Sequence, residues 1–226
     1  MTEFDNYASR YRDLLEDPLR DKFAKPEFFA ERKWILIQSF FQQQERELSQ
    51  LSWLDVGCGQ GELLRMGKDH WSMAAGCDPS GEMLKACDDL NIVRMTDPEK
   101  LPFADESFDF ITAVCVYHHV PPRSRVRLTG EIKRVLRPGG LICVIEHNPY
   151  NPVTQMIVRR TPVDRDAILL TSRETRKLMA STNLVVLRNI YFLFLPAKLF
   201  RSAPKFETLL AAVPLGGQFA MFAQKR

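Results

Sequence analysis

Short apolar runs alternate with segments of helical periodicity through most of this chain, and the alternation predicts the fold class. The apolar runs cover residues 51–56, 72–78, 91–96, 108–116 and 140–148. Strands that alternate with helices in this order form a mainly parallel sheet with helices packed on both faces. The pattern therefore predicts an α/β fold whose ligands bind at the carboxyl ends of the strands.

Both ends of the chain extend this core. Residues 1–49 are expected to form an N-terminal helical cap, because Pro26 suits a first helical turn and WILIQSFF supplies an apolar face. Residues 149–226 are expected to contain a substrate-side insertion, a helix capped by Ser172, and the last two strands. At 226 residues the chain has room for one such domain, and a second full domain would be cramped.

A glycine-rich loop follows the first apolar run. Gly57, Gly59 and Gly61 stand between LSWLDV and the helical sequence ELLRMG, an order that predicts a strand, a tight loop and a helix. Glycine permits positive φ and lets a ligand approach the backbone. The dinucleotide motif G-x-G-x-x-G would need a third glycine where this chain has Glu62, and no Gly-Lys-Ser/Thr ending is present. The spacing therefore disfavours a dinucleotide loop or a P-loop.

Composition limits the class of binding partner and the cellular compartment that we expect for this protein. Lys and Arg number 31 against 28 Asp and Glu, and no basic block stands out, so we expect a small-molecule partner and no nucleic acid. Five cysteines without a C-x-x-C pair are typical of reduced, buried thiols. The start, MTEFDNYASRYRDLLEDPLR, lacks the apolar core of a secretion signal, and no run of about 18 apolar residues occurs. We therefore expect a cytoplasmic protein.

The glycine loop resembles a motif of a known enzyme family. From Asp55 to Gly61 it reads D-x-G-x-G-x-G, which is similar to motif I of the class I S-adenosylmethionine-dependent methyltransferases, and the later phrases LPFADESFD and LRPGG stand in the family's order. The resemblance implies a Rossmann-like, seven-stranded, mostly parallel sheet with an antiparallel last strand and helices on both faces. It also implies a single methyltransferase domain over residues 1–226, a cofactor-binding core at 50–148, and S-adenosylmethionine as cofactor.

The second apolar strand ends at a carboxylate suited to the cofactor. Asp78 follows the glycine loop by about 20 residues, where a carboxylate can accept both hydroxyl hydrogens of a ribose. Ser80 can cap the next helix, which leaves Asp78 free. The resemblance assigns Asp97, after the third strand, to the adenine amino group. The expected cofactor-binding residues are Asp55, Gly57, Cys58, Gly59, Gly61, Asp78, Pro79, Met83, Thr96, Asp97, Pro98 and Val114.

Candidate catalytic groups follow the fourth and fifth strands. Tyr117, His118 and His119 come after the fourth strand, and Glu146 and His147 end the fifth, so both sets are expected to face the pocket. We predict His118 or His147 as general base, Glu146 as the group that orients a histidine or binds substrate, and His119 as a packing or capping residue. A metal site formed by His118, His119 and His147 is not expected, because adjacent histidines rarely converge on one ion and no thiolate completes the set.

The resemblance implies methyl transfer from S-adenosylmethionine. We expect the acceptor to be a hydroxyl oxygen of a sugar, an aromatic or a lipid-linked metabolite. Two other functions remain open, namely a cofactor-binding partner subunit without catalysis, and a methyltransferase acting on protein or nucleic acid. A methyltransferase acting on protein or nucleic acid is disfavoured, because this chain has VYHHVPP where an N-P-P-Y or D-P-P-Y tetrapeptide would support amine methylation. Arg159, Arg160 and FLFLPAKLFR leave a weak membrane-surface contact open. The oligomeric state is not predicted.

Overall fold

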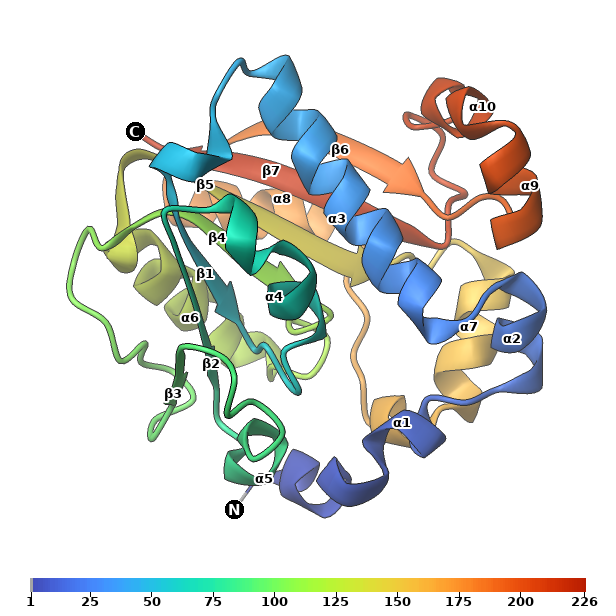
Figure 1. Ribbon diagram of the computed structural model, residues 1–226, viewed down its shortest axis with the longest axis horizontal. Helices are drawn as coiled ribbons and strands as arrows, with labels where there is room; N and C mark the ends of the chain where they lie inside the picture. Colours follow the sequence, from blue (N-terminus) through green and yellow to red (C-terminus); the bar gives the residue numbers. More distant parts are fainter. Residues whose placement is uncertain (1) are drawn as a thin grey trace.

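The computed structural model describes residues 2–226 and contains a seven-stranded sheet in the order β3-β2-β1-β4-β5-β7-β6 (Figure 1). The first five strands pair in parallel, and β7 runs antiparallel to both β5 and β6. The expected Rossmann-like sheet with an antiparallel last strand is therefore confirmed. The strands are β1 Ser52–Val56, β2 Met73–Asp78, β3 Ile92–Arg94, β4 Phe108–Val114, β5 Leu136–His147, β6 Leu184–Phe192 and β7 Gln218–Lys225.

Each face of the sheet buries a separate apolar cluster. Side chains alternate between faces along a strand, so Trp53 of β1 packs with helices α3 (Pro26–Gln43) and α4 (Glu62–Gly67), while Leu54 packs with α6 and α8 on the other side. Phe40 of α3 stacks on Phe222 of β7 with ring centroids 3.8 Å apart. Helices on both faces are thus confirmed. The second pair of helices is α6 Pro122–Val135 and α8 Ser172–Ser181.

Short helices gather beyond the carboxyl ends of the parallel strands. In Figure 1 the blue N-terminal segment, α5 and α7 stand around this end of the sheet, and α9 and α10 extend to one side. Among the described residues no helix is long and apolar enough to cross a lipid bilayer. The α-helices in this group are α1 Tyr11–Leu14, α2 Pro18–Phe23, α5 Gly81–Leu84, α7 Pro152–Arg160, α9 Ala197–Ser202 and α10 Pro204–Leu209. The 3-10 helices are η1 Glu3–Asn6, η2 Ala8–Arg10, η3 Leu48–Gln50, η4 Lys68–His70 and η5 Pro162–Asp164.

Several predicted boundaries differ from the structure. The sequence PPRSRVRLTGEIKRVLRP predicts a helix over residues 121–138 that is halted at Pro138. In the structure α6 ends at Val135, because β5 already begins at Leu136 and pairs with β4. Ser80 does cap α5, as expected, but Ser172 is not a cap. Instead Thr171 precedes α8 and exchanges hydrogen bonds with Glu174, a capping box that satisfies two backbone donors at once.

Candidate functional site

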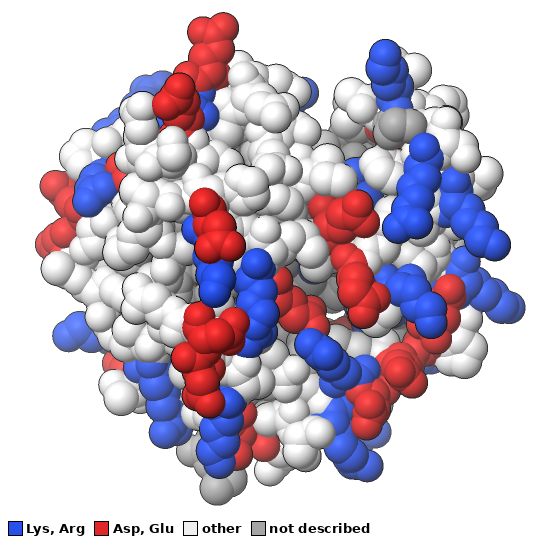
Figure 2. Space-filling view, in the orientation of Figure 1, with Lys and Arg blue, Asp and Glu red and all other residues white. Residues whose placement is uncertain are grey.

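A cavity of about 940 Å³ lies at the carboxyl ends of the parallel strands. Its lining combines the glycine loop, the ends of β2, β4 and β5, the N-terminal segment with Tyr11, and α7 with Ile157. The face in Figure 2 is hollowed right of its centre, and both Lys/Arg and Asp/Glu side chains stand around the opening. Since the walls come from segments far apart in the sequence, the cavity is a product of the whole fold.

The glycine loop contributes its backbone to one wall of the cavity. Gly57, Gly59 and Gly61 have φ values of 70°, 53° and 75°, a region that L side chains rarely adopt. A Cβ at Gly57 would lie 2.5 Å from Val116, whereas a Cβ at Gly59 would meet nothing within 4 Å. Gly57 is therefore needed for packing as well as for φ. Gly59 leaves open space beside the backbone, on the side where the cavity lies.

Asp78 is tied directly to this loop. Its carboxylate accepts a 2.9 Å hydrogen bond from the Gly59 amide and a 2.8 Å bond from the Ser80 amide. Burial raises the pKa of Asp78, although these two bonds act in the opposite direction. Each carboxylate oxygen retains a second acceptor position. Asp78 can therefore brace the loop and still accept hydroxyl hydrogens from a ligand in the cavity.

Asp55 lies deeper, under the loop. Its carboxylate accepts a 2.6 Å hydrogen bond from Thr112, whose hydroxyl in turn accepts a 2.8 Å bond from the Trp53 indole. Burial raises the pKa of Asp55 to about 7, because the charged form is costly in an apolar setting. This chain of bonds joins β1 to β4 beneath the cavity floor.

Ten of the twelve residues expected to bind the cofactor line the cavity, and Gly61 and Thr96 do not. Gly61 instead packs against Leu90, to which an added Cβ would approach within 2.2 Å. Thr96 follows β3 outside the lining. The position of the remaining ten is compatible with cofactor contact, and their individual roles stay predictions.

His118 and Glu146 form a buried pair at the other wall. His118 is 1% exposed, and its Nδ1 lies 2.5 Å from Glu146 Oε2. Glu146 Oε1 accepts hydrogen bonds from the amides of Val116 and Tyr117 at 3.0 and 2.8 Å. Because these two amides hold the carboxylate in place, Glu146 fixes the orientation of the His118 ring, the arrangement that its expected role requires.

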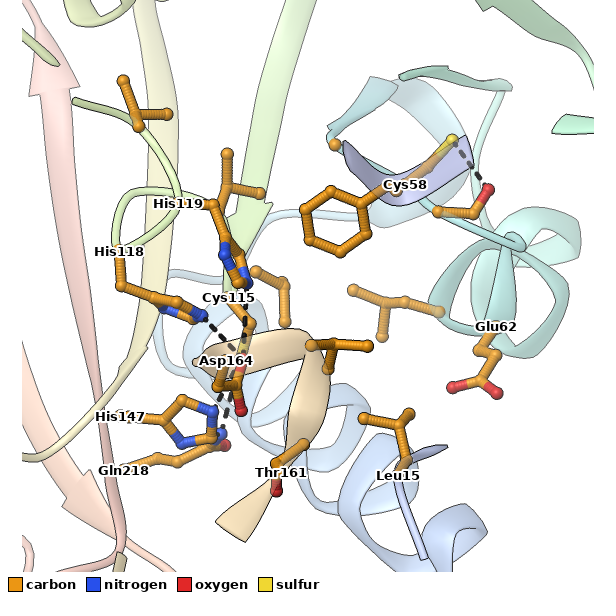
Figure 3. Close-up of a pocket in the computed structure, with 18 of the residues that line it drawn as sticks. Leu15, Cys58, Glu62, Cys115, His118, His119, His147, Thr161, Asp164 and Gln218 are labelled. Carbon is orange, nitrogen blue, oxygen red and sulfur yellow. Dashed lines mark hydrogen bonds and ion pairs between the residues drawn. The ribbon is translucent and has the colours of Figure 1, made fainter. Parts of the chain in front are cut away.

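Asp164 approaches the same histidine from the opposite side. Its Oδ1 lies 3.5 Å from His118 Nε2 and 3.4 Å from His119 Nε2 (Figure 3). Burial opposes the charged form of His118, but the charges of Glu146 and Asp164 raise the pKa of His118 well above its usual value. His119 packs edge to face against Phe4, with ring centroids 4.8 Å apart. It lines the cavity and does not cap a helix. Asp164 lies in the segment expected to form a substrate-side insertion, but it was not among the predicted site residues.

His147 and Cys115 complete this wall. Cys115 Sγ lies 4.0 Å from His147 Nε2, 4.0 Å from Lys33 Nζ and 3.5 Å from Gln218 Nε2. Burial opposes the thiolate, but Lys33 and His147 lower the pKa of Cys115 to about 7. Cys115 also has a φ of 57°, an uncommon value outside glycine that places its side chain beside His147. Cys115 was expected only to be a reduced thiol, and its proximity to His147 was not predicted.

Three ligand-type side chains converge here. Among the described residues, His118, His147 and Asp164 each offer a ligand atom, and these atoms lie within 4.8 Å of one another. In Figure 3 the three histidines lie on one side around Asp164, while Cys58 and Glu62 lie across the cavity. The set differs from the His118, His119 and His147 combination considered from the sequence, because Asp164 takes the place of His119.

Three arginines, Arg32, Arg159 and Arg160, lie outside the cavity lining. Arg32 is buried in an ion pair with Glu207 of α10, and its guanidinium lies 3.5 Å above the Phe200 ring. Arg160 pairs with Asp17 at 2.7 Å, and neither Arg159 nor Arg160 lines the cavity. These arginines join peripheral helices or face outward, so they are not contacts of the cavity.

Comparison with known proteins gives matches in sequence and in structure. A family model described as a methyltransferase domain matches residues 54–144. A tRNA (carboxymethyluridine(34)-5-O)-methyltransferase from Arabidopsis thaliana is 28% identical over 156 residues, or 68% of this chain and 37% of the relative. A 27-O-demethylrifamycin SV methyltransferase from Amycolatopsis mediterranei (strain S699) is 34% identical over 101 residues, which are 40% of this chain and 36% of the relative. The chain thus spans less than two fifths of either relative.

A solved structure shares the fold over nearly the full length. The chain matches a methyltransferase component of a complex with the Haloferax volcanii activator Trm112, with a TM-score of 0.66, 21% identity and coverage of 99% of this chain and 98% of that one.

The sequence matches also correct one expectation. The absence of a nucleic-acid partner, inferred from net charge, is overturned by relatives named as tRNA methyltransferases. Net charge averages over the whole surface, so it does not report on the local groups that select an acceptor.

Proposed function

We infer, from its membership of the class I S-adenosylmethionine-dependent methyltransferases, that this chain transfers the cofactor's methyl group to an oxygen atom of an acceptor held in the cavity. One observation carries the proposal. The glycine loop with Asp78 and the cluster of His118, His147 and Asp164 open into the same cavity from opposite walls. A donor at the first wall and an acceptor at the second would meet between them.

The first wall suits an adenosyl group carrying a sulfonium. The open space at Gly59 allows a ligand to contact the backbone, and Asp78 has free acceptor positions for two hydroxyl groups. Asp97 and Pro98 also line the cavity, and the family resemblance assigns Asp97 to the adenine amino group. When bound, S-adenosylmethionine supplies a methyl group already activated by positive sulfur. The chain has only to hold this group and the acceptor in line and close together.

The second wall holds the groups that we assign to activation of the acceptor. His118 is held between Glu146 and Asp164, and a histidine whose pKa is raised keeps its proton and is a poor base at neutral pH. His118, one of the two candidate bases from the sequence, is therefore disfavoured as the sole base. We assign activation of the acceptor to the cluster of His118, His147 and Asp164 as a unit.

The acceptor half of the cavity favours a molecule with an apolar body. Its walls include aromatic and aliphatic side chains from the N-terminal helices, α7 and the segment after β6. These side chains are Leu15, Phe23, Phe28, Phe29, Val153, Ile157, Leu193 and Phe194. Apolar walls with a few fixed polar groups are typical of sites for small ligands. We therefore propose a hydroxyl or carboxyl oxygen on a small, partly apolar metabolite.

A second candidate acceptor is a modified nucleoside of tRNA. The Arabidopsis relative is named for methylation of an oxygen on a tRNA uridine, and the Amycolatopsis relative is named for an oxygen on rifamycin SV. Oxygen as the acceptor atom is common to both names. An unstacked base with an apolar face would also fit walls of this kind.

The test measures methyl transfer from labelled S-adenosylmethionine into a metabolite extract and, separately, into bulk tRNA. We expect labelled product in one of the two pools, with production of S-adenosylhomocysteine. Both His118→Ala and His147→Ala should reduce transfer by about 100-fold or more, the scale of acid–base and positioning effects. His70→Ala is the matched control, because His70 packs near Trp34 and does not line the cavity.

Two outcomes would contradict the proposal. Binding of cofactor without any S-adenosylhomocysteine production would favour a non-catalytic partner subunit. Undiminished transfer by the double variant His118→Ala/His147→Ala would remove the cluster from the reaction.

A further inference from the structure

We propose that His118, His147 and Asp164 form a binding site for one divalent transition-metal ion of the zinc class. The site lies on the acceptor side of the cavity, between the ends of β4 and β5 and the turn η5. Binding of the ion stands on the geometry of these three residues, whereas its role in the reaction rests on the proposed methyl transfer.

The separation between Asp164 and His118 fits a shared ion better than a hydrogen bond, and all three ligand atoms lie within 4.8 Å of one another. An N–H···O hydrogen bond places its heavy atoms about 2.7–3.2 Å apart. Asp164 Oδ1 lies 3.5 Å from His118 Nε2, outside that range. Two ligands held about 2.0–2.1 Å from a tetrahedral ion are separated by about 3.3–3.4 Å. The pair is thus spaced close to one edge of a zinc tetrahedron.

His118 presents an unpaired nitrogen to the site. Its Nε2 is buried and has no hydrogen-bond partner, although the residue is only 1% exposed. A buried polar atom without a partner is costly, which makes it informative. The other ring nitrogen, Nδ1, faces Glu146 at 2.5 Å. A histidine that donates one nitrogen to a carboxylate and directs the other at an ion is the usual arrangement around metals.

The ligand types indicate the class of ion. Two imidazoles with one carboxylate suit zinc and neighbouring transition metals, while calcium and magnesium prefer oxygen ligands. His119 Nε2 also lies 3.4 Å from Asp164, and Cys115 Sγ lies 4.0 Å from His147 Nε2. Three protein ligands leave a coordination position open, as catalytic zinc sites do. In this site the open position would face the cavity.

The ion would activate the acceptor oxygen directly. A cation beside the acceptor oxygen lowers the pKa of its hydroxyl or carboxyl group, so the proton passes to water. The oxygen then forms a bond to the methyl carbon with its own electron pair. The bond from carbon to sulfur breaks, and its electrons stay on sulfur, which leaves neutral S-adenosylhomocysteine. No oxidant or further reactant is required.

The experiment measures binding of Zn²⁺ alone to chelator-treated full-length protein by calorimetry. Absorption spectroscopy with Co²⁺ provides an independent report on the ligand geometry. We expect one Zn²⁺ per chain and visible cobalt bands of tetrahedral intensity. Asp164→Asn should weaken Zn²⁺ binding by at least tenfold, and Glu146→Gln by about 10- to 100-fold through loss of its support to His118. Asp166→Asn, an exposed carboxylate on the same turn, is the matched control and should bind Zn²⁺ normally.

Binding of S-adenosylhomocysteine to the same samples separates the two proposals. If the wild-type protein binds S-adenosylhomocysteine but no Zn²⁺, or if Asp164→Asn binds Zn²⁺ as tightly as Asp166→Asn, the metal site is refuted and His118 with Asp164 is an ion pair only. If Asp164→Asn loses S-adenosylhomocysteine binding and so proves misfolded, the partly exposed His147→Gln takes its place under the same criterion. Zn²⁺ binding without methyl transfer to any acceptor would refute the proposed function and leave the site intact.

Discussion

Replacement of Gly59 by alanine separates the ligand role of the glycine loop from its backbone role. Gly59 has a φ of 53°, and an added Cβ would meet no atom within 4 Å. Gly139, in the exposed first part of β5, has a φ of 75° and an equally open Cβ position, but it does not line the cavity. Gly139→Ala is therefore a matched control with the same backbone strain and no ligand nearby.

The structure gives the expected size of each effect. Alanine in the left-handed region costs about 1–2 kcal/mol, and neither site adds a steric clash within the protein. Both variants should therefore lose about 1–2 kcal/mol of unfolding free energy, a change of about 2–8 °C in Tm for a domain of this size. A methyl group forced against a ligand that fills the space at Gly59 costs about a further 1–3 kcal/mol. That cost corresponds to roughly 5- to 150-fold weaker cofactor binding.

Thermal unfolding and calorimetry with S-adenosylhomocysteine test this prediction on the two variants side by side. We expect similar Tm losses for both, and weakened S-adenosylhomocysteine binding for Gly59→Ala alone. Equal affinities of the two variants would mean that the cofactor does not contact the loop at Gly59, and the assignment of this wall would have to be abandoned.

Three other predictions follow from buried charges. Asp78→Ala should weaken S-adenosylhomocysteine binding by about 1–3 kcal/mol, measured by calorimetry, and unchanged affinity would mean that the ribose is held elsewhere. The pKa of Asp55 rises from 3.8 to about 7 on folding, so the folded state binds more protons and stability falls as pH increases between these values, by up to about 4 kcal/mol. Urea unfolding at pH 5 and pH 7.5 should show a smaller loss for Asp55→Asn than for wild type, and parallel losses would contradict the raised pKa. Glu207→Gln should cost about 3 kcal/mol of unfolding free energy, because Arg32 stays buried without its charge partner, and a change below about 1 kcal/mol would show that the pair is dispensable.

The features that the sequence predicted well depend on neighbouring residues. The positive φ values of the glycine loop, the cap at Ser80 and the alternation of strands and helices each arise from chemistry within one or two turns of chain. The loop length and the strand order then follow, because parallel strands joined by helices can connect in few ways. For this reason the sequence predicts that Asp78 and Gly59 contribute to the same binding site.

Element ends were predicted less well where tertiary pairing competes with local preference. The helix expected to continue to Pro138 ends at Val135, since hydrogen bonds to β4 draw the next residues into β5. The cap of α8 was predicted at Ser172 and is Thr171 in the structure. Thr171 is favoured because the Glu174 side chain accepts a hydrogen bond from its backbone amide. The exact end of a helix therefore depends on contacts that cannot be read from the pattern of apolar and polar residues.

The strands, the glycine loop and the carboxylates beside it could be predicted from the amino-acid order, because each depends on residues close together along the chain. The meeting of Asp164 with His118 and His147, and the burial of Arg32 as a structural residue, depend on the packing of the folded chain. Asp164 stands on a turn after α7, and its position over the histidines depends on how that segment packs across the strand ends. Convergence of side chains from separate elements is set by packing, and packing is a property of the folded chain as a whole.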